Sequence, residues 1–239
     1  MRSRPRALVL EVVGPAGAGK SALLAALTRR EPSIQPVRRL RHLRHLVPLA
    51  WSVLSLLPVL LEVYWQSSHS LRTTLRYLVR LKAFHAIVAR ETAGPWKAVV
   101  LDEGPVFTLA MLGEVPMGSR FARAWHGALA QWAQTLDAVV WLDAPIIVLA
   151  HRIQTRAKAH AVKERDFEAI KEFLSRHRRL FTEVVSELTR GGSAQVIAFS
   201  TEQSSADEIA ARVLAALEGR ATSQVSAAGI LGTPDVVEP

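Results

Sequence analysis

An apolar segment that runs directly into a glycine-rich loop constrains this chain more than any other feature. Residues 14–21 read Gly-Pro-Ala-Gly-Ala-Gly-Lys-Ser, a full match to G-x-x-x-x-G-K-[ST], and they follow the apolar run 7–13. In such a loop the glycines turn backbone N–H groups toward phosphates, the lysine reaches the outer phosphates and the hydroxyl ligates Mg²⁺. The helix expected next would add the positive end of its dipole beneath the same anion. The pattern therefore predicts a nucleoside triphosphate site made of Gly14, Pro15, Ala16, Gly17, Ala18, Gly19, Lys20 and Ser21.

The bulk composition favours one intracellular α/β domain. With 239 residues, 49% of them hydrophobic, the chain can bury one sizeable core and is short for two. It contains no cysteine, which excludes disulfides, thiolate metal sites and thiol nucleophiles. Its basic start followed by apolar residues imitates a secretory signal, but Glu11 interrupts the apolar run, and cleavage would separate the phosphate loop from its strand. We expect a cytoplasmic protein.

The positive charge is concentrated near the start of the chain. Of the net +9, residues 1–45 hold ten Lys or Arg against two Glu, and the densest patch is 38–45. No aromatic residues are interleaved with its arginines, so we expect no nucleic-acid partner. The run 46–61 that follows has no charge, yet it is shorter than the ~20 residues that span a bilayer and contains Pro48 and Pro58. Residues 38–65 could thus form an active-site lid, which we favour, or contact a membrane peripherally.

Apolar segments alternate with helical patterns along the rest of the chain. This alternation predicts a parallel sheet covered on both faces, with ligands at the carboxyl ends of its strands. We expect strands at 7–13, 33–37, 98–102, 137–143 and 195–199, and helices from Lys20 and over 71–90, 121–136, most of 146–188 and 206–217. One domain then covers 1–218, with a helical acceptor or lid insertion at 38–95 and lid and helices at 146–190. The small, polar residues of 219–239 predict a disordered tail.

Two apolar strands end in aspartate, and an arginine pair follows the second. Asp102 has the position of an acid that serves Mg²⁺ or the nucleophile, whereas Asp143 precedes Ala-Pro and is interpreted as a cap of the next helix. Arg152 and Arg156 are four residues apart and share a helix face. They fit either a closing lid that neutralises phosphoryl charge or a solvated surface.

Taken together, the chain resembles the thymidylate kinase-like and deoxynucleoside kinase-like branch of P-loop small-molecule kinases. The matching segments are 14–21, 99–104, 139–143, 152–156 and 196–201, in family order across residues 7–218. The resemblance implies a P-loop NTPase fold: a five-stranded parallel sheet in the order 2-3-1-4-5, helices on both faces, a helical lid near 150–165 and an adenine pocket after Phe199. It also implies ATP and Mg²⁺ as cofactors and a small-molecule acceptor.

One departure from the family concerns the acceptor. Relatives place an arginine after the strand-terminal acid, whereas this chain has Asp102-Glu103. A carboxylate accepts hydrogen bonds from hydroxyl or ammonium groups, so Glu103 would bind a sugar, nucleoside or other polyol better than a bare phosphate. We therefore expect an ATP- and Mg²⁺-dependent kinase of a nucleoside, nucleotide or sugar. Its catalytic residues would be Lys20, Asp102, Arg152 and Arg156, its metal ligands Ser21 and Asp102, and its acceptor contact Glu103.

Two other functions stay open at this point. An apolar strand ending in Asp-Glu is also typical of hydrolytic P-loop ATPases, in which Glu103 would polarise water. Neighbouring strand residues point to opposite faces, so we do not expect Asp102 and Glu103 to serve the same atom. Residues 38–65 suggest, as the third option, a membrane-associated kinase of a lipid-linked or envelope precursor. A GTPase is disfavoured because the chain has no asparagine and no Thr-Lys-x-Asp.

Overall fold

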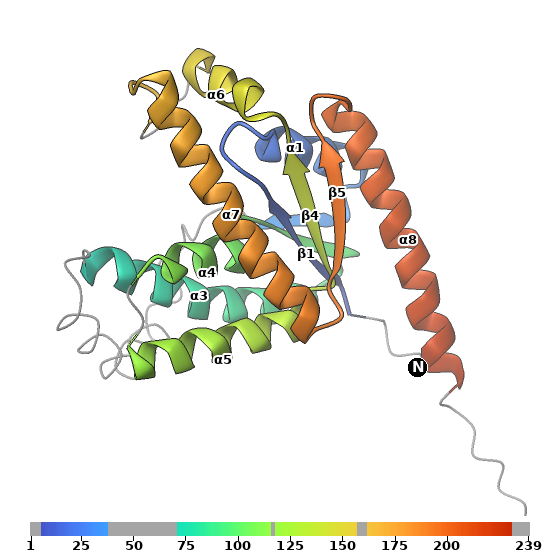
Figure 1. Ribbon diagram of the computed structural model, residues 1–239. Helices are drawn as coiled ribbons and strands as arrows, with labels where there is room; N and C mark the ends of the chain where they lie inside the picture. Colours follow the sequence, from blue (N-terminus) through green and yellow to red (C-terminus); the bar gives the residue numbers. More distant parts are fainter. Residues whose placement is uncertain (1–5, 38–70, 116–117, 157–161, 231–239) are drawn as a thin grey trace, which may run out of the picture.

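A five-stranded parallel sheet forms the centre of the molecule in a computed structural model (Figure 1). The structure describes residues 6–37, 71–115, 118–156 and 162–230. The strand order is β2-β3-β1-β4-β5, which confirms the predicted order 2-3-1-4-5. The strands are β1 (Leu8–Val13), β2 (Ile34–Val37), β3 (Ala98–Asp102), β4 (Ala138–Asp143) and β5 (Gln195–Ser200).

The central strands are rich in Val and Leu because helices cover both faces of the sheet. Every residue of β1 is buried, and β1 pairs with β3 on one side and β4 on the other. By contrast, β2 lies at an edge and pairs with β3 alone. Its Pro36 is tolerated there because an edge strand needs hydrogen bonds on one side only.

The helices divide the core into two parts. One face of β1 contributes Val9 and Val13 to a core beneath α3, α4, α5 and the later turns of α7. The other face contributes Leu8, Leu10 and Val12 to a core with α1, α6, α8 and the first turns of α7. The helices are α1 (Lys20–Arg30), α3 (Leu71–Thr92), α4 (Pro105–Gly113), α5 (Ser119–Thr135), α6 (Ile146–Thr155), α7 (Phe167–Gly191) and α8 (Ala206–Ile230). Figure 1 shows α3, α4 and α5 grouped on one side and α8 on the other.

The interpretation of Asp143 as a helix cap is wrong. Pro145 occupies the N-cap of α6, and no side chain caps that helix. Asp143 instead pairs with Arg178 of α7 at 2.7 Å, and the same guanidinium donates to the Ala144 carbonyl. The distant partner was not visible in the sequence because it comes from a helix more than thirty residues later.

The end of the chain also differs from expectation. We expected disorder from Gly219 onward, yet α8 stays helical to Ile230. The segment contains several alanines, the residue of highest helix propensity, and its glycines, Gly219 and Gly229, lie at its two ends and cost only about 1 kcal/mol each. The calls on 38–65, including the choice between lid and membrane contact, lie outside the described residues. Within the described residues, no helix combines the length and the apolar character that a membrane span requires.

Candidate active site

The phosphate loop joins β1 to α1 at the carboxyl edge of the sheet, and its backbone requires glycine. Gly14 has a φ of 148°, and a Cβ there would lie 2.1 Å from the Leu142 carbonyl oxygen. Gly17 and Gly19 have φ values of 83° and 85°, in the left-handed region that side chains disfavour. The loop packs closely against β4 and α6, since a Cβ on Gly17 would lie 3.0 Å from the Leu149 carbonyl. The loop therefore has the tight, glycine-dependent backbone that a phosphate cradle requires.

Lys20 lies at the first turn of α1, where its ammonium donates to two carbonyls of the loop itself. Its Nζ is 2.7 Å from the Gly14 oxygen and 2.9 Å from the Pro15 oxygen. Burial lowers the pKa of Lys20 to about 8, the carboxylates of Asp102 and Glu103 oppose that shift, and Arg156 adds to it. The charges of Asp102, Glu103 and Arg156 therefore all act on Lys20.

The two carboxylates at the end of β3 do not follow the alternation expected of strand residues. Asp102 is the last residue of β3 and pairs in register with Val12 of β1. Glu103 lies beyond the strand with a φ of 54°, in the left-handed region. Because the chain turns at Glu103, both carboxylates act on Lys20. The alternation expected of neighbouring strand residues does not apply to Glu103, because Glu103 lies outside β3.

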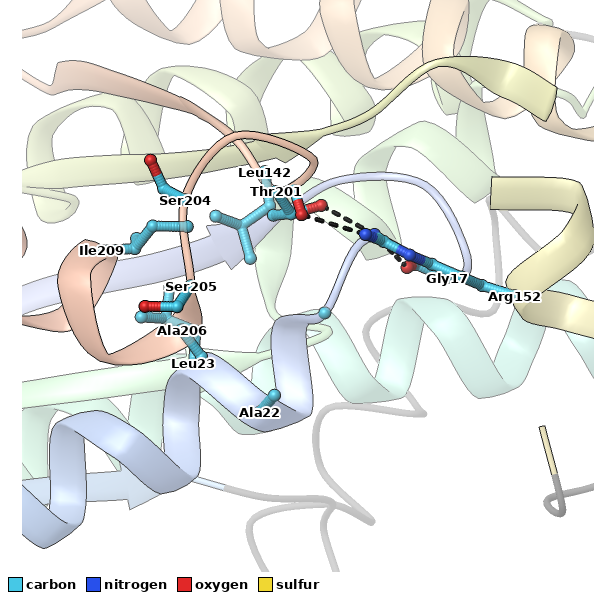
Figure 2. Close-up of a pocket in the computed structure, with 11 residues that line it drawn as sticks. Gly17, Ala22, Leu23, Leu142, Arg152, Thr201, Ser204, Ser205, Ala206 and Ile209 are labelled. Atoms are coloured by element: carbon cyan, nitrogen blue, oxygen red, sulfur yellow. Dashed lines mark hydrogen bonds between the residues drawn. The ribbon is translucent and has the colours of Figure 1, made fainter. Parts of the chain in front are cut away.

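A hollow of about 240 Å³ lies beside the phosphate loop (Figure 2). The first turns of α1 form one wall and the loop from β5 to α8 forms another. Its lining is mostly small or aliphatic, with a few hydroxyls and one guanidinium: Gly17, Gly19, Ala22, Leu23, Leu142, Arg152, Thr201, Ser204, Ser205, Ala206 and Ile209. An apolar slot with a few polar groups is the usual form of a small-ligand site. It adjoins the segment after Phe199, where the resemblance implied the adenine pocket.

Arg152 is part of this pocket wall. Its Nη1 donates to the Thr201 hydroxyl at 2.9 Å and its Nη2 to the Thr201 carbonyl at 2.9 Å, and Nη1 also lies 3.4 Å from the Gly17 carbonyl. Figure 2 shows the guanidinium spanning the space between the phosphate loop and the β5–α8 loop. The structure thus places Arg152 at the pocket and Arg156 within reach of Lys20. The expectation that the two arginines share a helix face is wrong, because α6 ends at Thr155 and Arg156 follows it in an extended conformation.

The residues predicted to hold Mg²⁺ have the appropriate donor chemistry. Ser21 follows Lys20 in the first turn of α1, and Asp102 ends the adjacent strand. No group of three or more His, Cys, Asp or Glu side chains that could bind a metal occurs among the residues described. A hydroxyl and a carboxylate are oxygen donors of the kind that Mg²⁺ takes together with water and nucleotide phosphates.

Two groups that the sequence reasoning did not single out for the site lie beside Glu103. Arg80 of α3 donates to the Glu103 carbonyl and lies 3.7 Å from its Oε2. Glu11, in the middle of β1, is fully buried and accepts hydrogen bonds at the start of α4. Arg80 resembled the other arginines of an amphipathic helix, so its sequence carried no distinguishing signal. Glu11 did carry one, because it is a charged residue inside an apolar strand.

Comparisons with known proteins identify the fold. No family model and no curated protein matches the sequence. Two structures of deoxyadenosine kinase from M. mycoides are similar. The one with the products dCMP and a flexible dCDP superposes with a TM-score of 0.55 at 10% identity, covering 89% of this chain and 100% of the other. The one with bound dATP has a TM-score of 0.52 at 10% identity, covering 87% and 98%. The chain therefore has a deoxynucleoside kinase-like P-loop kinase fold, as the motif order suggested.

Proposed function

We propose that this protein is a kinase that transfers a phosphoryl group from ATP, with Mg²⁺, to a small nucleoside-type acceptor. One observation carries the proposal: the pocket beside the phosphate loop lies on one face of the sheet, whereas Glu103, whose charge acts on Lys20, is contacted by Arg80 from the other face. The pocket with Arg152 and Thr201 belongs to the face of α1 and α8. Arg80 packs against Phe84 and Phe107 on the face of α3 and α4. Donor and acceptor would approach Lys20 from these two sides.

Each residue then has a definite task in the transfer. The loop amides and Lys20 bind the outer phosphates, and Ser21 and Asp102 are the residues that would hold Mg²⁺. The metal would supply charge neutralisation between the phosphates when bound. Asp102 orients or deprotonates the acceptor hydroxyl, while Lys20 and Arg156 stabilise charge on the transferring group. Glu103 accepts a hydrogen bond from the acceptor, and the dATP, dCMP and dCDP bound by the M. mycoides enzyme support a nucleoside-type choice.

The surroundings of Glu103 favour a kinase over an ATPase. A carboxylate that polarises water must have its oxygens available as a base. Here the guanidinium of Arg80, only 11% exposed, lies 3.7 Å from Glu103 Oε2, and the same arginine donates to the Glu103 carbonyl. This arrangement pairs Glu103 with a cation and suits a carboxylate that binds an acceptor. The membrane-associated alternative depends on 38–65 and gains no support from the described residues.

Glu103→Gln separates the two functions. In a kinase it removes one charged acceptor contact, so we expect KM for deoxyadenosine to rise roughly tenfold while KM for ATP changes little. Steady-state kinetics with deoxyadenosine, deoxycytidine and thymidine as acceptors measure this. The control is Glu202→Gln, an exposed carboxylate in the β5–α8 loop, which should leave both constants unchanged. Loss of hydrolysis with retained, trapped ATP in Glu103→Gln alone would instead show an ATPase.

Arg152→Ala should weaken nucleotide binding. The side chain ties Thr201 to the phosphate loop and borders the pocket, so its loss should raise the dissociation constant for ATP by about tenfold. Arg156→Ala, by contrast, should lower kcat more than it weakens ATP binding, because a charge near Lys20 acts most strongly in the transition state. Calorimetric titration with ATP and turnover of both variants measure the split. His151→Ala is the control, since His151 is exposed on the same helix; equal effects in all three variants would contradict these roles.

A further inference from the structure

The two edges of the sheet differ in how open they are to a further strand. At one edge, β2 has only four residues, and its Pro36 lacks a backbone N–H group. At the other edge, β5 has six residues, Gln-Val-Ile-Ala-Phe-Ser, without a charge or a proline. Edge strands of natural proteins are usually kept short or carry charges and prolines, because a free edge can pair with another strand. By this comparison β5 is the open edge of the sheet.

The backbone groups of β5 alternate between those that bond to β4 and those that point away from it. Gln195 and Thr201 donate their N–H groups to carbonyl oxygens of the segment 137–143, at 3.1 Å and 2.8 Å. In a parallel ladder both backbone groups of a residue point to the same side, so those of Val196 and Ala198 point out from the sheet. The part of the chain that the structure describes gives these outward groups no hydrogen-bond partner.

The side chains at this edge are apolar and accessible. Val196 is 39% exposed, and Ala198 is exposed as well. On the same face, Ala198 lies in register with Trp141 of β4, which is only partly buried. The opposite face is covered, because Ile197 and Phe199 belong to the core shared with α8, and Figure 1 shows β5 as the outermost strand on the side of that helix. Unpaired backbone groups and apolar side chains therefore lie together at one exposed edge.

We propose that the β5 edge is a dimer interface, at which a second copy of this chain adds its own β5 in antiparallel orientation and extends the sheet. A two-fold axis uses the same patch on both copies, so the patch must be complementary to itself. With the axis at Ile197, Val196 of one copy lies opposite Ala198 of the other, and each such pair exchanges both N–H···O bonds. An axis at Ala198 would instead pair Val196 with Ser200. That pairing is poorer, because the Ser200 carbonyl already accepts from the Ser204 amide at 3.1 Å.

Charges at the two ends of β5 favour the same occupant and the same orientation. Arg190, at the end of α7, precedes the strand and has a side chain that is 68% exposed beside Glu187. Glu202 follows the strand and is also exposed. An antiparallel copy brings the start of one strand to the end of the other, so charges of opposite sign lie at each end of the pair. A parallel copy would place like charges together.

Sedimentation velocity of the natural protein tests the interface without any assay of catalysis. We expect a reversible dimer whose share rises as the protein concentration increases from about 1 to about 100 µM. Val196→Lys places a charge on the shared edge of both copies and should raise the dissociation constant of the dimer at least about tenfold. Ile147→Lys is the matched control, because Ile147 is an exposed large hydrophobic residue, 65% exposed, on α6 and not on the edge strand. It should leave the dimer unchanged.

Two results of that experiment would overturn the proposal. One is a monomer throughout the concentration range, with the edge left free or covered by another part of the chain. The other is a dimer that Val196→Lys leaves as stable as Ile147→Lys does, since the interface would then lie elsewhere.

A cross-link tests the orientation and the register of the two strands. The chain has no cysteine, so a single introduced thiol can form a disulfide only with the same residue of a second copy. With the axis at Ile197, the two Ile197 Cα atoms lie about 4.5 Å apart, within the range of a disulfide. Ile197→Cys should therefore give a disulfide-linked dimer under mild oxidation, whereas Ala198→Cys, displaced along the strand from its equivalent, should give much less. Equal cross-linking of both variants, or none with Ile197→Cys, would reject antiparallel pairing about Ile197.

Discussion

Lys20→Ala is expected to lower ATP turnover by at least about 100-fold, the effect typical of removing one charged group that stabilises a transition state. Lys20 Nζ donates hydrogen bonds to the Gly14 and Pro15 carbonyls of the phosphate loop, so the same ammonium would donate to bound phosphates instead. Bound phosphates would also raise its pKa from about 8 and keep it charged. Initial rates of ADP formation at saturating ATP measure the decrease in turnover.

Stability separates a catalytic loss from a folding defect in that experiment. Lys20 is partly exposed and fills no core space, so the melting temperature of Lys20→Ala should stay close to that of the natural protein. Lys171→Ala is the matched control, because Lys171 makes only local contacts within α7, an ion pair with Glu168 and a cation–π contact with Phe167. Undiminished turnover in a folded Lys20→Ala protein would reject the nucleotide site itself.

Asp102→Asn is expected to lower transfer by about 100- to 1,000-fold, in line with the loss of a general base or a metal-orienting carboxylate. Asparagine has nearly the same shape, so β3 should keep its register with β1 and the protein should remain folded. The variant removes a negative charge beside Lys20 and a hard oxygen ligand from the predicted Mg²⁺ site. Single-turnover assays at increasing Mg²⁺ concentration separate these two roles.

A metal role and a base role give different results for Asp102→Asn. If Asp102 orients Mg²⁺, excess metal should restore part of the rate; if it is the base, excess metal should have no effect. Asp207→Asn serves as the control, since Asp207 forms only surface ion pairs with Arg29 and Arg30. A rate for Asp102→Asn equal to that of the control would remove Asp102 from the mechanism.

The sequence predicted the sheet because the local signals agree with the global fold. The runs around Leu10, Val100 and Val140 are apolar apart from Glu11 and the strand-terminal acids, as strands buried on both faces require, and the phosphate loop marks where ligand is expected. The strand expected at 33–37 is also present despite its Pro36, since an edge strand tolerates proline.

The sequence could not predict which side chains from distant segments contact one another at the site. Arg178 and Asp143 pair across two elements, and Arg80 reaches Glu103 from a helix that looks like any amphipathic helix. Patterns of period 2 or 3.6 fix which face a residue occupies but not which residue it meets there. Glu11 differs from these residues because an acid inside an apolar strand is visible in the sequence as a group that needs hydrogen-bond partners. Only the fold shows that these partners are the amides of α4.

The fate of the γ-phosphoryl group tests the kinase function most directly. ATP labelled in that group is incubated with Mg²⁺ and the protein, alone or with deoxyadenosine, deoxycytidine or thymidine, and the labelled products are separated. The proposed function predicts label on an acceptor, ADP formed in equal amount, and little inorganic phosphate when no acceptor is present. Label released entirely as inorganic phosphate, at a rate that no acceptor changes and that Glu103→Gln abolishes, would contradict it.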